Sequence, residues 1–564
     1  MTPPGHRPGP PALPARASSG GRAGAGSRAT ASAAVAVAVV LALGLAGCAG
    51  ASTGDPAPFG ASATGDPAAT GDPPAGVAQA LINALPGHWS ADKAEYGQTQ
   101  TIDLANGSAK IDAPGAYRLT GRLADGQVTV AVKKKGLVQL VLDGADITSQ
   151  TSAAINVEAA DEVVIILADG SSNAVTDAAV YAEPDGEPDA AIFSKVDLSI
   201  AGGGALEVAG RAGDAIASKD GLVIAGGQLT VTAADDAVKG RDYLRLAGGQ
   251  VTIEAGGDAL KATNADDAGA GYVLLEGGAV TAKAAADCVD AATDALVTAG
   301  SAVLTCGDDA IHGEARLVVD GGAIDVRQSV EGLEAPVLVL AGGEIRIVAS
   351  DDGLNAAASS EDSEDSEDSD GADAGGGGRG FAPGRGAMGV QEGVSLSITG
   401  GEIWIEAGSD GIDANGPGVI AGGLVTVYAQ ANGMNGPFDI AEGGPTITGG
   451  TVVAYGTGAG RGAILSPDQS STQTWVAASW AEAASGLVEV TDQTGAVIVS
   501  LETDQSVSAV VISAPGLLAG DVYTLALGGL AVQTTAGEAT SGFGGGPGGD
   551  GGGPGQRGGG RGRR

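Results

Sequence analysis

The sequence predicts an all-β fold, a right-handed parallel β-helix with rungs of about 22 residues, followed by a small C-terminal β cap and flanked by disordered tails. Two repeats in phase predict it. An acid, a small residue and an aliphatic residue recur from Asp214 to Asp410, mostly at intervals of 21 or 22 residues. Asn432 is expected to continue this series, with Asn435 three residues after it. Glycine pairs recur with them, from Gly202-Gly203 to Gly449-Gly450. With 99 glycines and only 3% aromatic residues, thin aliphatic layers suit the core better than large rings.

The glycine pairs indicate a corner that needs a positive φ. Apolar and polar residues alternate around each corner, as in Leu222–Ile224 before it and Leu229–Val231 after it, which is typical of strands. Connections between parallel strands are overwhelmingly right-handed, and this sets the expected hand. A leucine-rich repeat has a similar period, but its asparagine ladder and leucine framework are absent.

The chain divides into segments of different composition. The expected boundaries are a lipoprotein signal peptide at 1–47, a Pro/Gly/Ala-rich tether at 48–90, the β-helix at 91–462, an all-β cap at 463–540 and a disordered Gly/Arg tail at 541–564. An acidic, Gly-rich insertion at 357–389 is expected to loop out of one rung without breaking the stack.

The N-terminus has the pattern of an export signal. Arginines precede an apolar run at Ala31–Leu45, which ends in Leu45-Ala46-Gly47-Cys48. We expect Cys48 to become the lipidated N-terminus, anchoring the protein to the outer face of the cell membrane. The alternative, a short transmembrane anchor, fits less well because a spanning helix needs about 20 apolar residues. Outside the cytoplasm, Cys288 and Cys306 are expected to form a disulfide.

The net charge of −39 argues against nucleic acid as a partner. Acids stacked at the spacing of neighbouring strands repel one another, so a cation is expected between them, and doubled acids supply enough oxygens for calcium. The candidate calcium ligands are Asp235, Asp236, Asp258, Asn264, Asp266, Asp287, Asp308, Asp309, Asp351, Asp352 and Asp410. The alternative is that each acid only accepts backbone N–H groups at a corner.

Two sets of residues are candidates for binding sugar. Lys239, Arg241 and Lys261 follow the acids on an outward strip, where they could meet an acidic sugar or only balance the acids. Trp404, Tyr428 and Tyr455 are expected to face solvent and to offer flat apolar surface to sugar rings. Their alternative is that they are isolated surface aromatics or are covered by the cap.

Three phased segments carry a family resemblance: residues 191–195 (AIFSK), 225–231 (AGGQLTV) and 234–240 (ADDAVKG). With them, the chain from about Tyr117 to Thr524 resembles the secreted bacterial carbohydrate-binding parallel β-helix proteins. The resemblance implies non-catalytic binding of cellulose and of pectin-type acidic sugars, with calcium bound to the helix.

We therefore expect a monomeric surface module that binds polysaccharide and is not an enzyme. A calcium-dependent pectate-type lyase is the second hypothesis, with Lys239, Arg241 or Lys261 as the base, and it rests on fold analogy alone. A structural surface adhesin is the third.

Overall fold

The computed structural model describes residues 81–82, 85, 90–181, 186–358, 390–429, 435–441, 443–456 and 467–538. The predicted signal peptide, Cys48, the Gly/Arg tail from 541 and most of the 357–389 insertion lie outside these residues. No described helix is long and apolar enough to cross a membrane.

The described chain is all-β apart from short helical turns, among them η1 (Ala91–Ala94) and η2 (Leu104–Asn106). The strands form a 25-stranded and a 13-stranded sheet. The 13-stranded sheet contains β2 (Ala109–Ile111), β4 (Val128–Ala131), β6 (Ile155–Ala159), β9 (Ala190–Ser194), β12 (Asp214–Ser218), β14 (Val238–Gly240), β16 (Leu260–Ala262), β18 (Val289–Ala291), β20 (Ile311–Gly313), β23 (Leu333–Glu334), β26 (Leu354–Ala356), β29 (Ile412–Ala414) and β32 (Phe438–Ile440).

The 25-stranded sheet carries the rest of each repeat. Before the last cap strands it contains β1 (Gln100–Asp103), β3 (Gly115–Leu123), β5 (Leu137–Thr148), β7 (Glu162–Leu167), β8 (Ser172–Thr176), β10 (Leu198–Gly202), β11 (Ala205–Gly210), β13 (Gly221–Ala233), β15 (Tyr243–Ala255), β17 (Tyr272–Ala284), β19 (Asp294–Thr305), β21 (Arg316–Val319), β22 (Ala323–Ser329), β24 (Val337–Leu340), β25 (Glu344–Ala349), β27 (Ser395–Ile398), β28 (Glu402–Ala407), β30 (Gly418–Ile420), β31 (Leu424–Ala429), β33 (Thr446–Ile447) and β34 (Thr451–Gly456).

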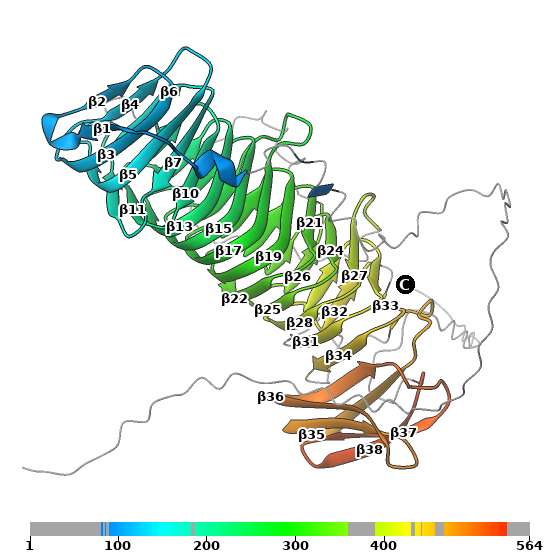
Figure 1. The fold of residues 1–564 in the computed structure, drawn as a ribbon. Coiled ribbons are helices and arrows are strands. Elements are labelled where there is room, and N and C mark those ends of the chain that lie inside the picture. Colours follow the sequence, from blue (N-terminus) through cyan, green and yellow to red (C-terminus); the bar gives the residue numbers. More distant parts are fainter. Residues whose placement is uncertain are drawn as a thin grey trace, which may run out of the picture. The chain divides into compact units, whose positions relative to one another are not determined.

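Each strand of the stack pairs in parallel with the equivalent strand of the next repeat (Figure 1). The register places like residues opposite like residues. Leu229 lies opposite Val251, and Val231 opposite Ile253. These side chains belong to one continuous buried aliphatic cluster. The expected all-β, parallel architecture is confirmed.

The glycine pairs form the corners that the sequence predicts. Gly249 has φ +89°, and a Cβ on it would lie 3.0 Å from the carbonyl oxygen of Gly227. A Cβ on Gly248 would lie 2.7 Å from the oxygen of Ala225. The corner therefore requires glycine both for its backbone angle and for the close approach of the preceding repeat.

The segment before the first strand lies on the sheet. Leu85 packs with Leu274, Leu296 and Val318, which point outward from the large sheet and are nevertheless buried. The residues of and just after η1 are also attached to the large sheet, because Gln139 of β5 donates to the carbonyl oxygens of Lys93 and Glu95. Leu81, Ile82 and Leu85 belong to the expected tether at 48–90, and they lie against this apolar strip.

The cap is an antiparallel extension of the large sheet, formed by β35 (Trp475–Thr491), β36 (Val497–Ser513), β37 (Val522–Leu527) and β38 (Leu530–Thr535). β36 pairs antiparallel with β34 and so closes the edge of the last repeat (Figure 1).

Candidate functional site

The acids that precede the strands of the small sheet form a hydrogen-bonded ladder. The Asp236 N–H donates to Asp214 Oδ1 at 3.2 Å, and the Asp258 N–H donates to Asp236 Oδ1 at 3.0 Å. The same contact joins Asp287 to Asp258 and Asp309 to Asp287, each at 2.8 Å. Each carboxylate therefore satisfies a backbone donor of the next repeat, which is the alternative role considered for these acids, and keeps its second oxygen for another partner.

A second column of side chains lies three residues after the ladder, one side chain per strand from β14 to β32. The register stacks Lys239, Lys261, Asp290, His312, Glu334, Asn355, Asp413 and Asp439. The last position differs from the sequence interpretation, in which Asn435 followed a ladder residue Asn432. Gly436 instead takes the ladder place, since its N–H donates to Asp410 Oδ1 at 2.6 Å.

The first two lysines of this column neutralise the ladder. Lys239 Nζ lies 2.6 Å from Asp214 Oδ2 and 2.9 Å from Asp236 Oδ2. Burial lowers the pKa of Lys239, but the two carboxylates outweigh this effect and hold the pKa above its usual value. Lys261 repeats the arrangement between Asp258 and Asp290, with its Nζ 2.9 Å from Asp290 Oδ2. At these repeats the cation between the acids is a lysine, so neither ammonium group is free.

The predicted loop ligands are also used within the protein. Asn264 is buried, and its Oδ1 accepts the N–H groups of Asp266 and Asp267 at 3.1 Å each. Its Nδ2 donates to Asp242, which also pairs with Arg241 at 2.7 Å. Asn264 therefore shapes the loop, and Asp266 is exposed beside it.

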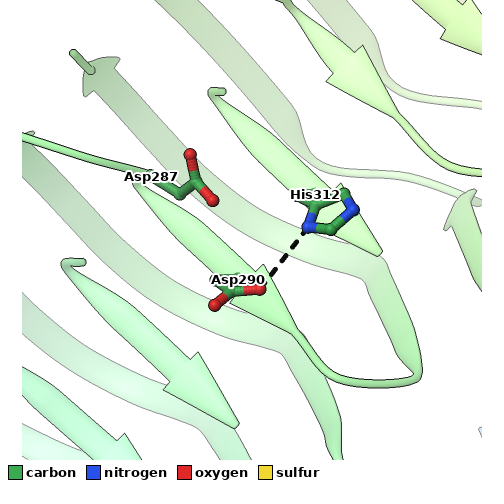
Figure 2. A group of neighbouring side chains, drawn as sticks. All are labelled: Asp287, Asp290 and His312. Carbon is green, nitrogen blue, oxygen red and sulfur yellow. Dashed lines mark ion pairs between the residues drawn. The ribbon is translucent and has the colours of Figure 1, made fainter. Parts of the chain in front are cut away.

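His312 is the last residue of the second column that can carry a positive charge. Figure 2 shows its ring beside Asp290, with Nδ1 3.5 Å from Asp290 Oδ1, and Asp287 nearby. Ligand atoms of these three residues lie within 4.8 Å of one another. Burial raises the pKa of Asp287 to about 7, and the neighbouring acids add to the rise.

The next group contains three acids and an amide. Carboxylate oxygens of Asp309, Glu331 and Glu334 lie within 4.8 Å of one another. Burial, followed by the contacts with Asp309 and Glu331, raises the pKa of Glu334 to about 10. Asn355 Nδ2 donates to Glu331 and lies 3.4 Å from Glu334 Oε1. Asn355 is only 8% exposed, and its buried Oδ1 has no partner within the described ranges.

Farther along, the acids stand without cations. Burial raises the pKa of Asp352 to about 8, that of Asp413 to about 7 and that of Asp410 to about 6. Within the described part of the chain, none of the three forms a salt bridge. Among the described residues, the ladder thus changes from acids that pair with Lys239 and Lys261 to acids without a basic partner from Asp352 onward.

The structure brings only part of the predicted metal set together. Of the predicted ligands, Asp235, Asp236, Asp287 and Asp309 fall in groups compact enough for one ion, together with Asp214, Asp290, His312, Glu331 and Glu334. Asp258 is bound to Lys261, while Asp308, Asp351, Asp352 and Asp410 belong to no such group within the described residues. The register of the second column is the signal that finds Asp290, His312 and Glu334, because a residue three places after each ladder acid faces the same side. Asp214 and Glu331 belong to the ladder itself.

The aromatic prediction was partly wrong. Tyr455 is 2% exposed, because the cap covers it and packs it with Val453 and Ile512. Tyr428 is half-buried and packs against the same cluster. Trp404 is half-buried, with the Arg346 guanidinium 4.4 Å from its ring centre. The covering by the cap was the alternative considered from the sequence.

The expected Cys288–Cys306 disulfide is present, with a Cα–Cα distance of 5.6 Å. It lies in the buried core between neighbouring repeats.

Comparison with known proteins adds a function class. Residues 105–363 match the family model described as "Carbohydrate-binding domain-containing protein". This chain is similar to carbohydrate-binding domain proteins. A relative of that description from Acetivibrio thermocellus is 37% identical over 163 residues, 28% of this chain and 57% of the relative. The match thus spans little more than half of that relative's length. A solved structure, that of a polysaccharide lyase-like protein from C. thermocellum (gadolinium derivative), is 31% identical, covering 39% of this chain and 96% of that chain with a TM-score of 0.38.

Proposed function

We propose that this protein is an exported lipoprotein, anchored through Cys48, that binds polysaccharide such as cellulose or a pectin-like acidic glycan without cleaving it. Its parallel stack is a right-handed β-helix, in line with the usual hand of parallel connections. The observation that carries the proposal is the match of residues 105–363 to a carbohydrate-binding family. The protein acts as a monomer.

Non-catalytic binding is favoured over the lyase alternative by the occupation of the candidate bases. A lysine that removes a proton from a sugar must be neutral and within reach of it. Lys239 and Lys261 each lie between two carboxylates, which keep them protonated. Arg241 is held by Asp242.

Calcium is the cation that suits the acids of the ladder and the second column that have no lysine partner. Asp309, Glu331 and Glu334 supply carboxylate oxygens, and Asn355 supplies an amide. A 180° turn of this amide exchanges Nδ2 and Oδ1 and would present its unpartnered oxygen to the acids. Oxygen ligands of this kind suit calcium, and the ion would stabilise the ionised form of acids that otherwise stay protonated through burial. Calcium would also supply positive charge for an acidic glycan.

One experiment separates the hypotheses. The purified chain from residue 49 is incubated with cellulose and with polygalacturonate, with calcium or with chelator, and both retention and the release of unsaturated uronide are measured. We expect retention on at least one glycan and no uronide. Release of unsaturated uronide would establish the lyase hypothesis instead. If the protein were retained on neither glycan, the structural surface adhesin would be the remaining hypothesis.

A further inference from the structure

The outward surfaces of the parallel stack differ in what covers them. The strip on β13 to β24 is covered by Leu81, Ile82 and Leu85. The small sheet carries the acid ladder and the second column, which we together call the acid column; some of its acids pair with lysines and others have no basic partner among the described residues. The third surface is formed by the outward side chains of the strands that follow the glycine corners, from β11 to β31. These strands run in parallel up to the cap (Figure 1).

Aromatic side chains gather where that last surface meets the cap. We call this place the seam, formed by Trp404, Glu406, Tyr428, Trp480 and Gln505. Tyr428 and Trp480, from β31 and β35, both pack against the buried cluster of the cap. Gln505 Nε2 of β36 donates to Glu406 Oε2 of β28 at 3.1 Å. The seam thus holds two of the four tryptophans of a chain with 3% aromatic residues.

The register places these side chains on one face of the sheet. Trp404 and Glu406 are two residues apart on β28, and Glu406 lies opposite Tyr428. In the next repeat the equivalent position is Tyr455, which the cap buries. The surface therefore changes within three strands from open sheet to cap, and the seam lies at the transition.

Two features of the seam exceed what attachment of the cap requires. Trp404 belongs to none of the buried clusters of the described chain and touches Arg346 instead. Trp480 keeps its Nε1–H buried, with no acceptor among the described residues. Leaving such a donor unsatisfied costs about 1–3 kcal/mol. Because Nε1 is buried, a ligand hydroxyl would accept from it only after the Trp480 ring shifts toward the seam.

We propose that the seam binds a neutral hexose chain, with a sugar ring against Trp404 and Tyr428 and sugar hydroxyls paired with Glu406, Gln505 and Trp480. Apolar ring faces beside a carboxylate and an amide match the C–H faces and hydroxyls of a pyranose. Glu344 and Glu402 are exposed on the same face, which disfavours a uronate. This inference rests on the proposed function and adds a site outside residues 105–363.

The test is a titration of the chain from residue 49 with cellohexaose, followed by calorimetry and tryptophan fluorescence. We expect Trp404→Ala and Trp480→Ala to weaken binding by roughly tenfold or more, as removal of a central aromatic anchor does. Tyr96→Ala is the matched control, an exposed aromatic near the other end of the stack, and it should bind like the wild type. If Trp480→Ala lowers the melting temperature, Trp480→Phe and Gln505→Ala replace it.

The outcomes separate the two proposals. Wild-type affinity in Trp404→Ala, Trp480→Phe and Gln505→Ala, while the wild type binds, would overturn the seam and leave the proposed function standing. Loss of binding in Glu334→Gln alone would move the site to the acid column. Stronger binding of hexagalacturonate than of cellohexaose at the seam would contradict the neutral class. A wild type that binds no glycan would remove the proposed function and the seam together.

Discussion

The backbone N–H of Asp287 donates to the carboxylate of Asp258, one repeat earlier, at 2.8 Å. This contact gives the acids of the ladder a structural role that does not depend on a metal ion. One oxygen of each acid is tied to the backbone of its neighbour, and the other oxygen of Asp258 meets Lys261. The ladder is therefore partly a structural device of the stack, and calcium is proposed only where its acids have no lysine partner.

Asp258→Ala should destabilise the fold, because it removes the acceptor of the part-buried Asp287 N–H and one carboxylate of Lys261. We expect a loss of about 2–3 kcal/mol, measured by urea unfolding. Asp258→Asn keeps an oxygen for the Asp287 N–H and should lose about half as much. The matched control is Asp266→Ala at an exposed loop position, where a change within about 0.5 kcal/mol is expected. Equal stability of all three variants would refute the structural role of the ladder.

Glu334→Gln tests the proposed calcium group in a way that separates charge from packing. Without calcium, burial already favours the protonated, neutral form of Glu334, so a neutral amide should leave the melting temperature nearly unchanged. With calcium, the wild type should gain stability and the variant should gain less, because one ligand charge is missing. Differential scanning fluorimetry with and without chelator gives both values. An identical calcium response in the two proteins would place the ion elsewhere.

The sequence could predict the repeat, the corner glycines and the acid ladder, because each of these is a local pattern that stacking multiplies. It could not predict which acids remain bare. Lys239 and Glu334 occupy the same column of side chains. Only the structure shows that Lys239 lies between two carboxylates, whereas Glu334 lies beside two other acids. Tyr455 was misplaced for a similar reason, since alternation places it outward but does not reveal that β36 folds over it.

The calcium-free protein should become less stable as pH rises from about 4 to 8. Asp352, Asp413 and Asp410 have pKa values raised in the fold to about 8, 7 and 6. An acid with a raised pKa releases its proton in the unfolded chain near pH 4 but keeps it in the fold, so the unfolded state binds fewer protons over this interval. The contribution of such an acid to the free energy of unfolding is therefore fully present below about pH 4, and it is lost as pH rises through the pKa that the acid has in the fold.

Melting temperatures in chelator-containing buffers across this range measure the effect. Asp352→Asn should flatten the profile, because the amide does not titrate and its oxygen can still accept the Asp410 N–H. Saturating calcium should also flatten it if the ion reaches this part of the column. A wild-type profile that rises between pH 4 and pH 8 would contradict the raised pKa values.

The segment around Leu85 should be required for solubility as well as stability. Leu85 is 8% exposed and covers Leu274, Leu296 and Val318, apolar side chains that point outward from the large sheet. Leu85→Asp would place a charge on this strip and lift the segment, exposing a run of apolar surface in neighbouring strands. We expect a loss of about 2–3 kcal/mol and concentration-dependent association, measured by unfolding and by light scattering after gel filtration. Leu487→Asp, at a cap position that is 45% exposed, is the matched control and should remain as monomeric as the wild type. If Leu85→Asp matched that control in both measurements, the strip would be covered by something other than this segment.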